Sequence, residues 1–255
     1  MRAPIDSLAA PMFPAGMDWV NVASLRMDKQ LGRPVLLEFW DFCRSNSLRT
    51  LPYVRAWHAR HAAAGLRVIS VHAGGYPVSR DPDQVRAAVA RLEIEHPVLL
   101  DTDFALWREY ENEGWPARYL FDRDLRLHSF HYGEGLYHET AAEIAELLGE
   151  EAPAFEPVRP EDAPGALLVV PTPEQAGAWS GPYEAGAVWA VLEPRAGASA
   201  GAGASVRVNG AALAVPHAGC FCLVEHERHS HGELELEVGD DVTCHAVQFT
   251  AGLAD

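Results

Sequence analysis

Apolar positions in the first 150 residues form two kinds of segment. Short apolar runs stand at residues 35–40, 66–72, 97–101 and 117–121, and such runs are typical of strands buried on both faces of a mainly parallel sheet. Between and after them, apolar residues recur with helical spacing over residues 45–64, 82–92, 104–110 and 140–148. Strands that alternate with helices in this way predict an α/β domain.

Residues that typically begin, end or kink helices occur at several positions. Asp81-Pro82 predicts a helix start, with Asp81 as the N-cap and proline at the first helical position. Gly149 predicts the end of the last helix of this region. Pro52 falls inside the first predicted helix, where it is expected to produce a kink.

The pattern changes after residue 149. Four prolines stand among Glu and Ala residues over positions 150–165, which is typical of a stiff, extended linker. Beyond it, apolar residues recur with a period of two at residues 188–192, 205–208, 220–224, 234–238 and 243–249, and Asn209-Gly210 predicts a tight turn. We therefore expect an α/β domain over residues 1–149, a linker over 150–165 and a small antiparallel β-sandwich over 166–255.

Composition and charge limit the classes of molecule that the protein is expected to bind. With 48% hydrophobic residues, the 255-residue chain can bury the cores of two domains. A formal net charge of −16 argues against nucleic acid and anionic membranes as partners. No apolar run approaches the 18 or so residues of a membrane span, and the proline-broken N-terminus lacks the apolar region of a signal peptide. We expect a cytoplasmic protein, or a mature chain from which a leader has been removed.

The stretch over residues 35–52, VLLEFWDFCRSNSLRTLP, joins a buried strand to a helix through a short polar turn. At such a turn the helix N-terminus offers free N–H groups and the positive end of the helix dipole, and α/β folds place their chemistry there. Phe39-Trp40 before the turn and Leu51-Pro52 after it resemble the thioredoxin fold of the TlpA/DipZ type, among the redoxin and AhpC/TSA proteins. The resemblance implies a thiol–disulfide oxidoreductase fold with a Cys-x-x-Cys pair in the turn.

The resemblance also implies a cis-proline at Pro116 and a jelly-roll-like module, similar to a carbohydrate-binding fold, in the C-terminal part. Counting five residues forward from Phe39 and eight back from Pro52 places the cysteine pair at Arg44 and Ser47. Neither is a cysteine. A His-Thr-Pro-Glu segment in the family is here residues 72–75, so its acid is replaced by Gly75. Because exchange needs a thiolate and a resolving thiol, the fold is expected without its usual reaction.

The residues that the resemblance places around the former active-site groove are Glu38, Trp40, Arg44, Ser47, Gly75, Trp115 and Pro116. Glu38 matches the buried acid that moves protons during exchange in this family. Burial alone raises the pKa of a carboxyl group, whereas a contact with Arg44 or another base lowers it. The sequence leaves both outcomes open for Glu38.

Cys43 stands one residue before the expected nucleophile position. It could act as a lone reactive thiol in a one-cysteine oxidoreductase or a peroxidase-like protein, because the neighbouring Arg44 would favour its thiolate. Alternatively, Cys43 simply packs near the turn. The three remaining cysteines all lie beyond residue 219, so the first domain offers no resolving partner.

Cysteines and histidines gather in the second domain. Cys220 and Cys222 alternate along a predicted strand and are expected to face its core as small apolar side chains. His226, His229 and His231 are expected in a polar hairpin loop; they are weak metal-ligand candidates, because their spacing fits no standard zinc signature. We expect no metal and no cofactor.

Three hypotheses follow. The first is a thioredoxin-like protein that has lost thiol–disulfide chemistry and serves as a binding or scaffold module, with an unknown protein or small ligand at the former groove. The second is an enzyme that uses Cys43. The third is a carbohydrate- or metal-binding protein that works through its C-terminal domain. The first is preferred, so the chain is expected not to be an enzyme.

Overall fold

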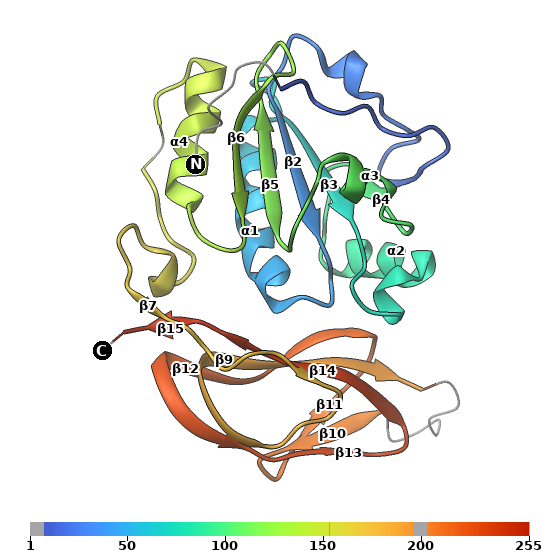
Figure 1. The fold of residues 1–255 in the computed structure, drawn as a ribbon, viewed down its shortest axis with the longest axis vertical. Coiled ribbons are helices and arrows are strands. Elements are labelled where there is room, and N and C mark those ends of the chain that lie inside the picture. Colours follow the sequence, from blue (N-terminus) through green and yellow to red (C-terminus); the bar gives the residue numbers. More distant parts are fainter. Residues whose placement is uncertain (1–7, 153, 196–202, 255) are drawn as a thin grey trace. The chain divides into compact units, whose positions relative to one another are not determined.

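A computed structural model describes residues 8–152, 154–195 and 203–254 (Figure 1). The chain divides into two compact units. The first comprises the described residues up to Asp41 together with Asn46–Val158, and the second comprises Phe42–Ser45 together with the described residues from Arg159 onward.

A six-stranded sheet forms the centre of the first unit, in the order β1-β4-β3-β2-β5-β6. The neighbours β4, β3 and β2 are parallel, whereas β1, β5 and β6 each run antiparallel to their neighbours. Every residue of β2 is buried, as its unbroken apolar run predicts for a central strand. The strands are β1 (Asp18–Val20), β2 (Val35–Trp40), β3 (Arg67–His72), β4 (Val98–Leu100), β5 (Ala117–Phe121) and β6 (Leu127–Tyr132).

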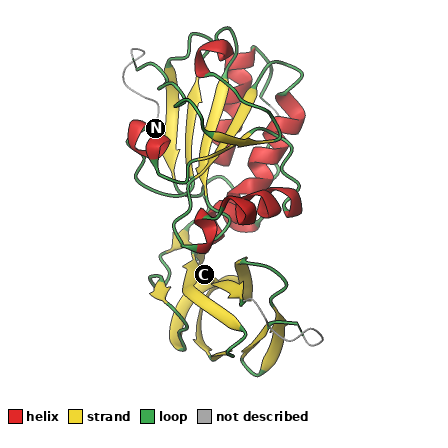
Figure 2. Cartoon of the chain, turned by 90° about the vertical axis from the view of Figure 1, so that its right-hand side faces the viewer, coloured by secondary structure: helices red, strands yellow, loops and turns green. Residues whose placement is uncertain are grey.

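Helices lie against this sheet (Figure 2), and apolar side chains pack between the helices and the sheet. Successive residues of a strand point to opposite faces: Leu37 and Phe39 of β2 join a core cluster that includes Leu106 of α3. Leu36 joins the other cluster, with residues such as Val54 of α1 and Ile144 of α4. The helices are α1 (Ser45–His61), α2 (Pro82–Arg91), α3 (Ala105–Glu109) and α4 (Tyr137–Leu148), with short 3-10 turns η1 (Met27–Gln30) and η2 (Val78–Arg80).

Helix α2 begins as the sequence predicts. The Asp81 side chain accepts a hydrogen bond from the backbone N–H of Asp83 at 2.9 Å, and Pro82 is the first helical residue. Loss of such a cap costs about 1 kcal/mol, so we expect Asp81→Ala to lower the free energy of unfolding in urea by that amount. Asp81→Asn keeps the capping oxygen and is the matched control. Equal losses in the two variants would contradict this role.

The second unit is all-β. Its sheets have the orders β12-β9-β14-β8, β11-β10-β13 and β15-β7, with antiparallel neighbours throughout. Side chains from the first two sheets, including Val188, Leu192, Val206 and Leu236, form one core cluster. The elements are η3 (Pro160–Asp162), β7 (Leu168–Val169), β8 (Gln175–Ala176), β9 (Gly181–Pro194), β10 (Ser205–Val208), β11 (Ala211–Ala214), β12 (Gly219–Leu234), β13 (Leu236–Val238), β14 (Val242–Thr250) and β15 (Gly252–Leu253).

The predicted tight turn lies between β10 and β11. Asn209 and Gly210 have φ angles of 48° and 81°, and two successive residues with positive φ define the type I′ turn that joins paired strands.

Two expectations about β12 are wrong. His226, His229 and His231 do not lie in a hairpin loop, because all three belong to this long strand. Cys222 is exposed and Cys220 half-buried, whereas Phe221 packs against the core cluster. The pair of cysteines therefore lies on the strand face opposite to the core, since neighbouring residues of a strand alternate between faces.

No helix in the described ranges is long and apolar enough to cross a membrane.

Candidate functional site

The turn between β2 and α1 carries the residues in which the cysteine pair was expected. Arg44 is half-buried and directly precedes Ser45, the first residue of α1. Ser47, the third residue of the helix, is fully buried, and its hydroxyl oxygen accepts a hydrogen bond from the backbone N–H of Asp41 at 3.3 Å. Cys43 lies one residue before Arg44, with none of its surface exposed.

A buried carboxylate at the end of β2 holds the neighbouring loop. Asp41 Oδ2 accepts hydrogen bonds from the backbone N–H of Gly75 at 2.7 Å and from the Ser79 hydroxyl at 3.1 Å. The loop that contains Gly75 is thus bound to an acid that directly follows the adjacent strand β2. Sequence reasoning missed Asp41, although an acidic residue immediately after a buried apolar strand was the signal for it.

His72, at the end of β3, completes the buried part of this region. Its Nε2 lies 3.7 Å from Asp41 Oδ1, and its ring makes an edge contact with Trp40 at a centroid distance of 5.0 Å. Burial lowers the pKa of His72 to about 3, so the imidazole is neutral at physiological pH. Trp40 itself is only 1% exposed.

The third loop contains the Trp115–Pro116 peptide bond, which is cis. The Trp115 indole N–H donates to the carbonyl oxygen of Ala73 at 2.8 Å, and the Asn46 side-chain amide donates to the carbonyl oxygen of Trp115 at 2.6 Å. These bonds tie together the turn after β2, the loop after β3 and the loop before β5. We call this junction of Trp40, Ser47, Gly75, Trp115 and Pro116 the loop site.

The loop site offers limited chemistry. Within the described residues, the Ser47 hydroxyl makes no hydrogen bond to a histidine, and a serine becomes nucleophilic only beside such a base. Trp115 and Gly75 are half-buried, whereas Pro116 is buried. The site therefore presents an indole ring and backbone groups rather than a nucleophile.

Glu38 lies deeper in the sheet, between two polar residues on neighbouring strands. It stands opposite Ser70 of β3 and Arg118 of β5, and it is completely buried. Burial raises the pKa of Glu38 to about 7, against the opposing effects of the hydrogen bond from Ser70 and the positive charge of Arg118. Of the two outcomes that the sequence leaves open, the structure favours the raised pKa, and the basic residue near Glu38 is Arg118 rather than Arg44.

Arg118 is only 2% exposed. Its Nη2 donates to the carbonyl oxygen of Gly135, and its guanidinium lies over the rings of Tyr137 and Trp57 at 5.0 and 5.7 Å. Burial lowers its pKa. Sequence reasoning missed Arg118, although a single arginine within an apolar strand was visible.

The three histidines of β12 do not all share a single partner. His226 Nε2 lies 3.0 Å from the Tyr183 hydroxyl, whereas His229 and His231 approach the Glu184 carboxylate at 3.7 and 3.2 Å. In the described part of the chain, no three His, Cys, Asp or Glu side chains are arranged to hold a metal ion.

Comparison with known proteins gives partial matches. No family model matches the chain. Protein DipZ of Mycobacterium tuberculosis is 33% identical over 141 residues, which are 55% of this chain but 20% of DipZ. The thiol-disulfide oxidoreductase YkuV of Bacillus subtilis is 29% identical over 115 residues, 45% of this chain and 77% of YkuV. The matched segment thus spans about a fifth of DipZ.

Among solved structures, the thioredoxin-like superfamily protein SPOA0173 aligns with a TM-score of 0.52 at 23% identity. The alignment covers 58% of this chain and all of that protein. At this identity the similarity establishes the fold alone.

Proposed function

The first unit is a thioredoxin-fold domain of the redoxin type, and from this premise we propose that it has lost thiol–disulfide exchange and binds a partner at the loop site. The observation that carries the proposal is the identity of the residues at the start of α1. Arg44 and Ser47 occupy the two positions that the Phe39 and Pro52 markers assign to the cysteine pair. Arginine cannot attack a disulfide, and a serine hydroxyl cannot resolve a mixed disulfide.

The alternative enzyme would use Cys43. Thiol chemistry needs a thiolate that its substrate can reach, and Cys43 is 0% exposed. A buried thiol of this kind behaves as a small apolar side chain. The burial of Cys43 therefore favours the binding role over the one-cysteine enzyme.

The chemistry of the loop site supports a binding role. Trp115 provides a half-buried aromatic surface, and aromatic side chains contribute strongly to recognition. The hydrogen bonds from Trp115 and Asn46 hold the three loops in place, and a preorganised surface loses less entropy on binding. The partner in this proposal is a protein or a small ligand.

Activity assays on the intact chain test the proposal. We expect neither insulin reduction with dithiothreitol nor peroxide consumption above the rate of the buffer, and we expect Cys43→Ser to leave both unchanged. Cys222→Ser, at an exposed cysteine of the second unit, is the matched control. Activity that disappears in Cys43→Ser and persists in Cys222→Ser would replace the binding role by the one-cysteine enzyme.

A further inference from the structure

A chain of hydrogen bonds leads from Glu38 across the sheet. The Ser70 hydroxyl donates to Glu38 Oε2 at 3.0 Å, and the Ser70 hydroxyl oxygen also lies 2.7 Å from His96 Nε2. All three residues are 0% exposed. A serine hydroxyl carries one proton, so when it donates to Glu38 it must accept the second bond from His96 Nε2–H.

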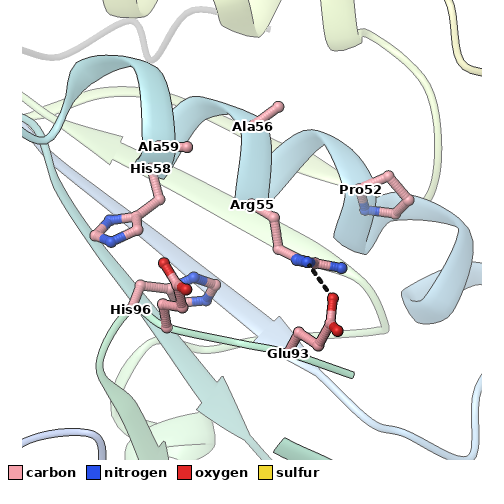
Figure 3. A pocket seen from close by; sticks show the side chains of 8 residues that line it. Pro52, Arg55, Ala56, His58, Ala59, Glu93 and His96 are labelled. Atoms are coloured by element: carbon pink, nitrogen blue, oxygen red, sulfur yellow. Dashed lines mark hydrogen bonds and ion pairs between the residues drawn. The ribbon is translucent and has the colours of Figure 1, made fainter. Parts of the chain in front are cut away.

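His96 ends this chain in the wall of a surface cleft. The cleft has a volume of about 370 Å³ and lies beside α1 and the segment between α2 and β4 (Figure 3). Its lining residues are Pro52, Arg55, Ala56, His58, Ala59, Glu93, Glu95 and His96.

The second nitrogen of His96, Nδ1, points to no partner in the described part of the chain. Among the described residues, neither His96 Nδ1 nor His58 Nδ1 has a hydrogen-bond partner, and the two rings lie 5.5 Å apart between centroids. His58 is half-buried and lines the same cleft as His96. A buried imidazole with one nitrogen bound to the core and the other unpaired beside a cleft has the form of a relay.

We propose that this cleft is the proton entry site of Glu38, with His96 and Ser70 as the path. A proton taken up at His96 Nδ1 releases the Nε2 proton to Ser70 Oγ, and the Ser70 hydroxyl proton passes to Glu38 Oε2. One proton enters and one carboxylate is neutralised. His96 remains neutral overall and changes tautomer, so each hydrogen bond of the chain reverses its direction.

The charges around the path suit this role. Burial keeps the pKa of His96 at about 3, with His58 and Arg55 as further lowering influences, so His96 passes a proton on rather than storing it. Glu38, with a pKa of about 7, is the group that holds the proton near neutral pH. On the opposite side of Glu38 lies Arg118 of β5. Burial lowers the pKa of Arg118, and the nearby Glu38 and the α4 residues Tyr137, Glu139 and Glu143 act to raise it.

The cleft contains both signs of charge. Arg55 Nη2 forms an ion pair with Glu93 at 3.1 Å. Burial lowers the pKa of His58, Arg67 lowers it further, and Glu95 has a smaller raising effect. The proton path does not depend on the binding role, because Glu38 titrates whether or not the loop site holds a partner.

Nuclear magnetic resonance of the unaltered chain provides the first test. With ¹⁵N-labelled histidine and ¹³C-labelled glutamate, the His96 ring should shift from the Nε2–H toward the Nδ1–H tautomer at the same pH midpoint at which the Glu38 carboxyl is protonated. Glu38→Gln should abolish this change. A His96 tautomer that stays constant while Glu38 titrates would overturn the proposal.

The second test measures the rate. After a rapid drop in pH, the carboxylic acid band of Glu38, identified by its absence in Glu38→Gln, should appear at least tenfold more slowly in Ser70→Ala and His96→Phe than in the parent chain. His61→Phe, at a buried histidine of α1 outside this path, is the control and should keep the parent rate. Parent rates in folded Ser70→Ala and His96→Phe would exclude this path. If those variants do not fold, the tautomer measurement decides.

Discussion

Replacing both Arg44 and Ser47 by cysteine, in a chain that also carries Cys43→Ser, is expected to create disulfide reductase activity. The rate of insulin reduction should rise by roughly 100-fold or more over the parent, because the pair supplies a thiolate nucleophile and an intramolecular resolving thiol. This is the largest functional change that we expect from any substitution in the chain.

The geometry of α1 supports this result. Position 44 directly precedes the helix and position 47 is its third residue, so both lie where free N–H groups and the helix dipole favour a thiolate. Side chains three residues apart at a helix start are about 5–6 Å apart at Cβ, close to the separations that a disulfide spans after small adjustment. Trp115 and Pro116 already flank this turn.

Two single variants are the controls. Arg44→Cys and Ser47→Cys, each in the same Cys43→Ser background, lack a resolving thiol and should remain near the parent rate. A double variant that folds and forms its disulfide but does not reduce insulin would contradict the expectation that a cysteine pair in this turn is sufficient for activity. The Gly75 loop would then be the next region to change.

The second large effect concerns stability and pH. Below pH 4.5, the ordinary pKa of the group, Glu38 is protonated in both folded and unfolded chains and has no net effect. Between pH 4.5 and its folded pKa of about 7, the unfolded state ionises first, so stability falls as pH rises. Above about pH 7, the ionised buried carboxylate costs roughly 3 kcal/mol, since each pKa unit corresponds to about 1.4 kcal/mol.

Glu38→Gln removes this titration and keeps the shape of the side chain. As the pH rises from 4 to 8, the parent should therefore lose roughly 3 kcal/mol of unfolding free energy relative to Glu38→Gln. Urea unfolding at a series of pH values measures it. Glu93→Gln, at an exposed carboxyl, is the control. A Glu38→Gln difference that is constant across this range would contradict a raised pKa.

The sequence predicts most of the first unit because local signals and tertiary structure agree there. Apolar runs became the buried strands β2, β3, β4 and β5, and the Asp81-Pro82 signal marks the start of α2. The three adjacent polar residues in the middle of the sheet were not predictable in the same way. Ser70, Glu38 and Arg118 become neighbours only through the pairing of β3 with β2 and of β2 with β5, which no local pattern specifies.

The second unit was predicted less well for a different reason. β12 is long and carries polar residues on both faces, and its pairing with β9 is irregular between Cys222 and Val224 and between Glu225 and Ser230. Each irregularity shifts the alternation between faces, so the period-two pattern ends near residue 224. The histidines beyond that point consequently resemble a loop in the sequence although they belong to a strand.

The order of strands in the first unit has a consequence for synthesis on the ribosome. Val35 of the central strand β2 pairs with Phe121 of β5, and Asp18 of β1 pairs with Leu100 of β4. Contacts between residues so distant in sequence form late, since a long loop must close first. One edge of β2 therefore stays unpaired until β5 has emerged from the exit tunnel, which makes the nascent chain a natural client for chaperones that shield unpaired strands.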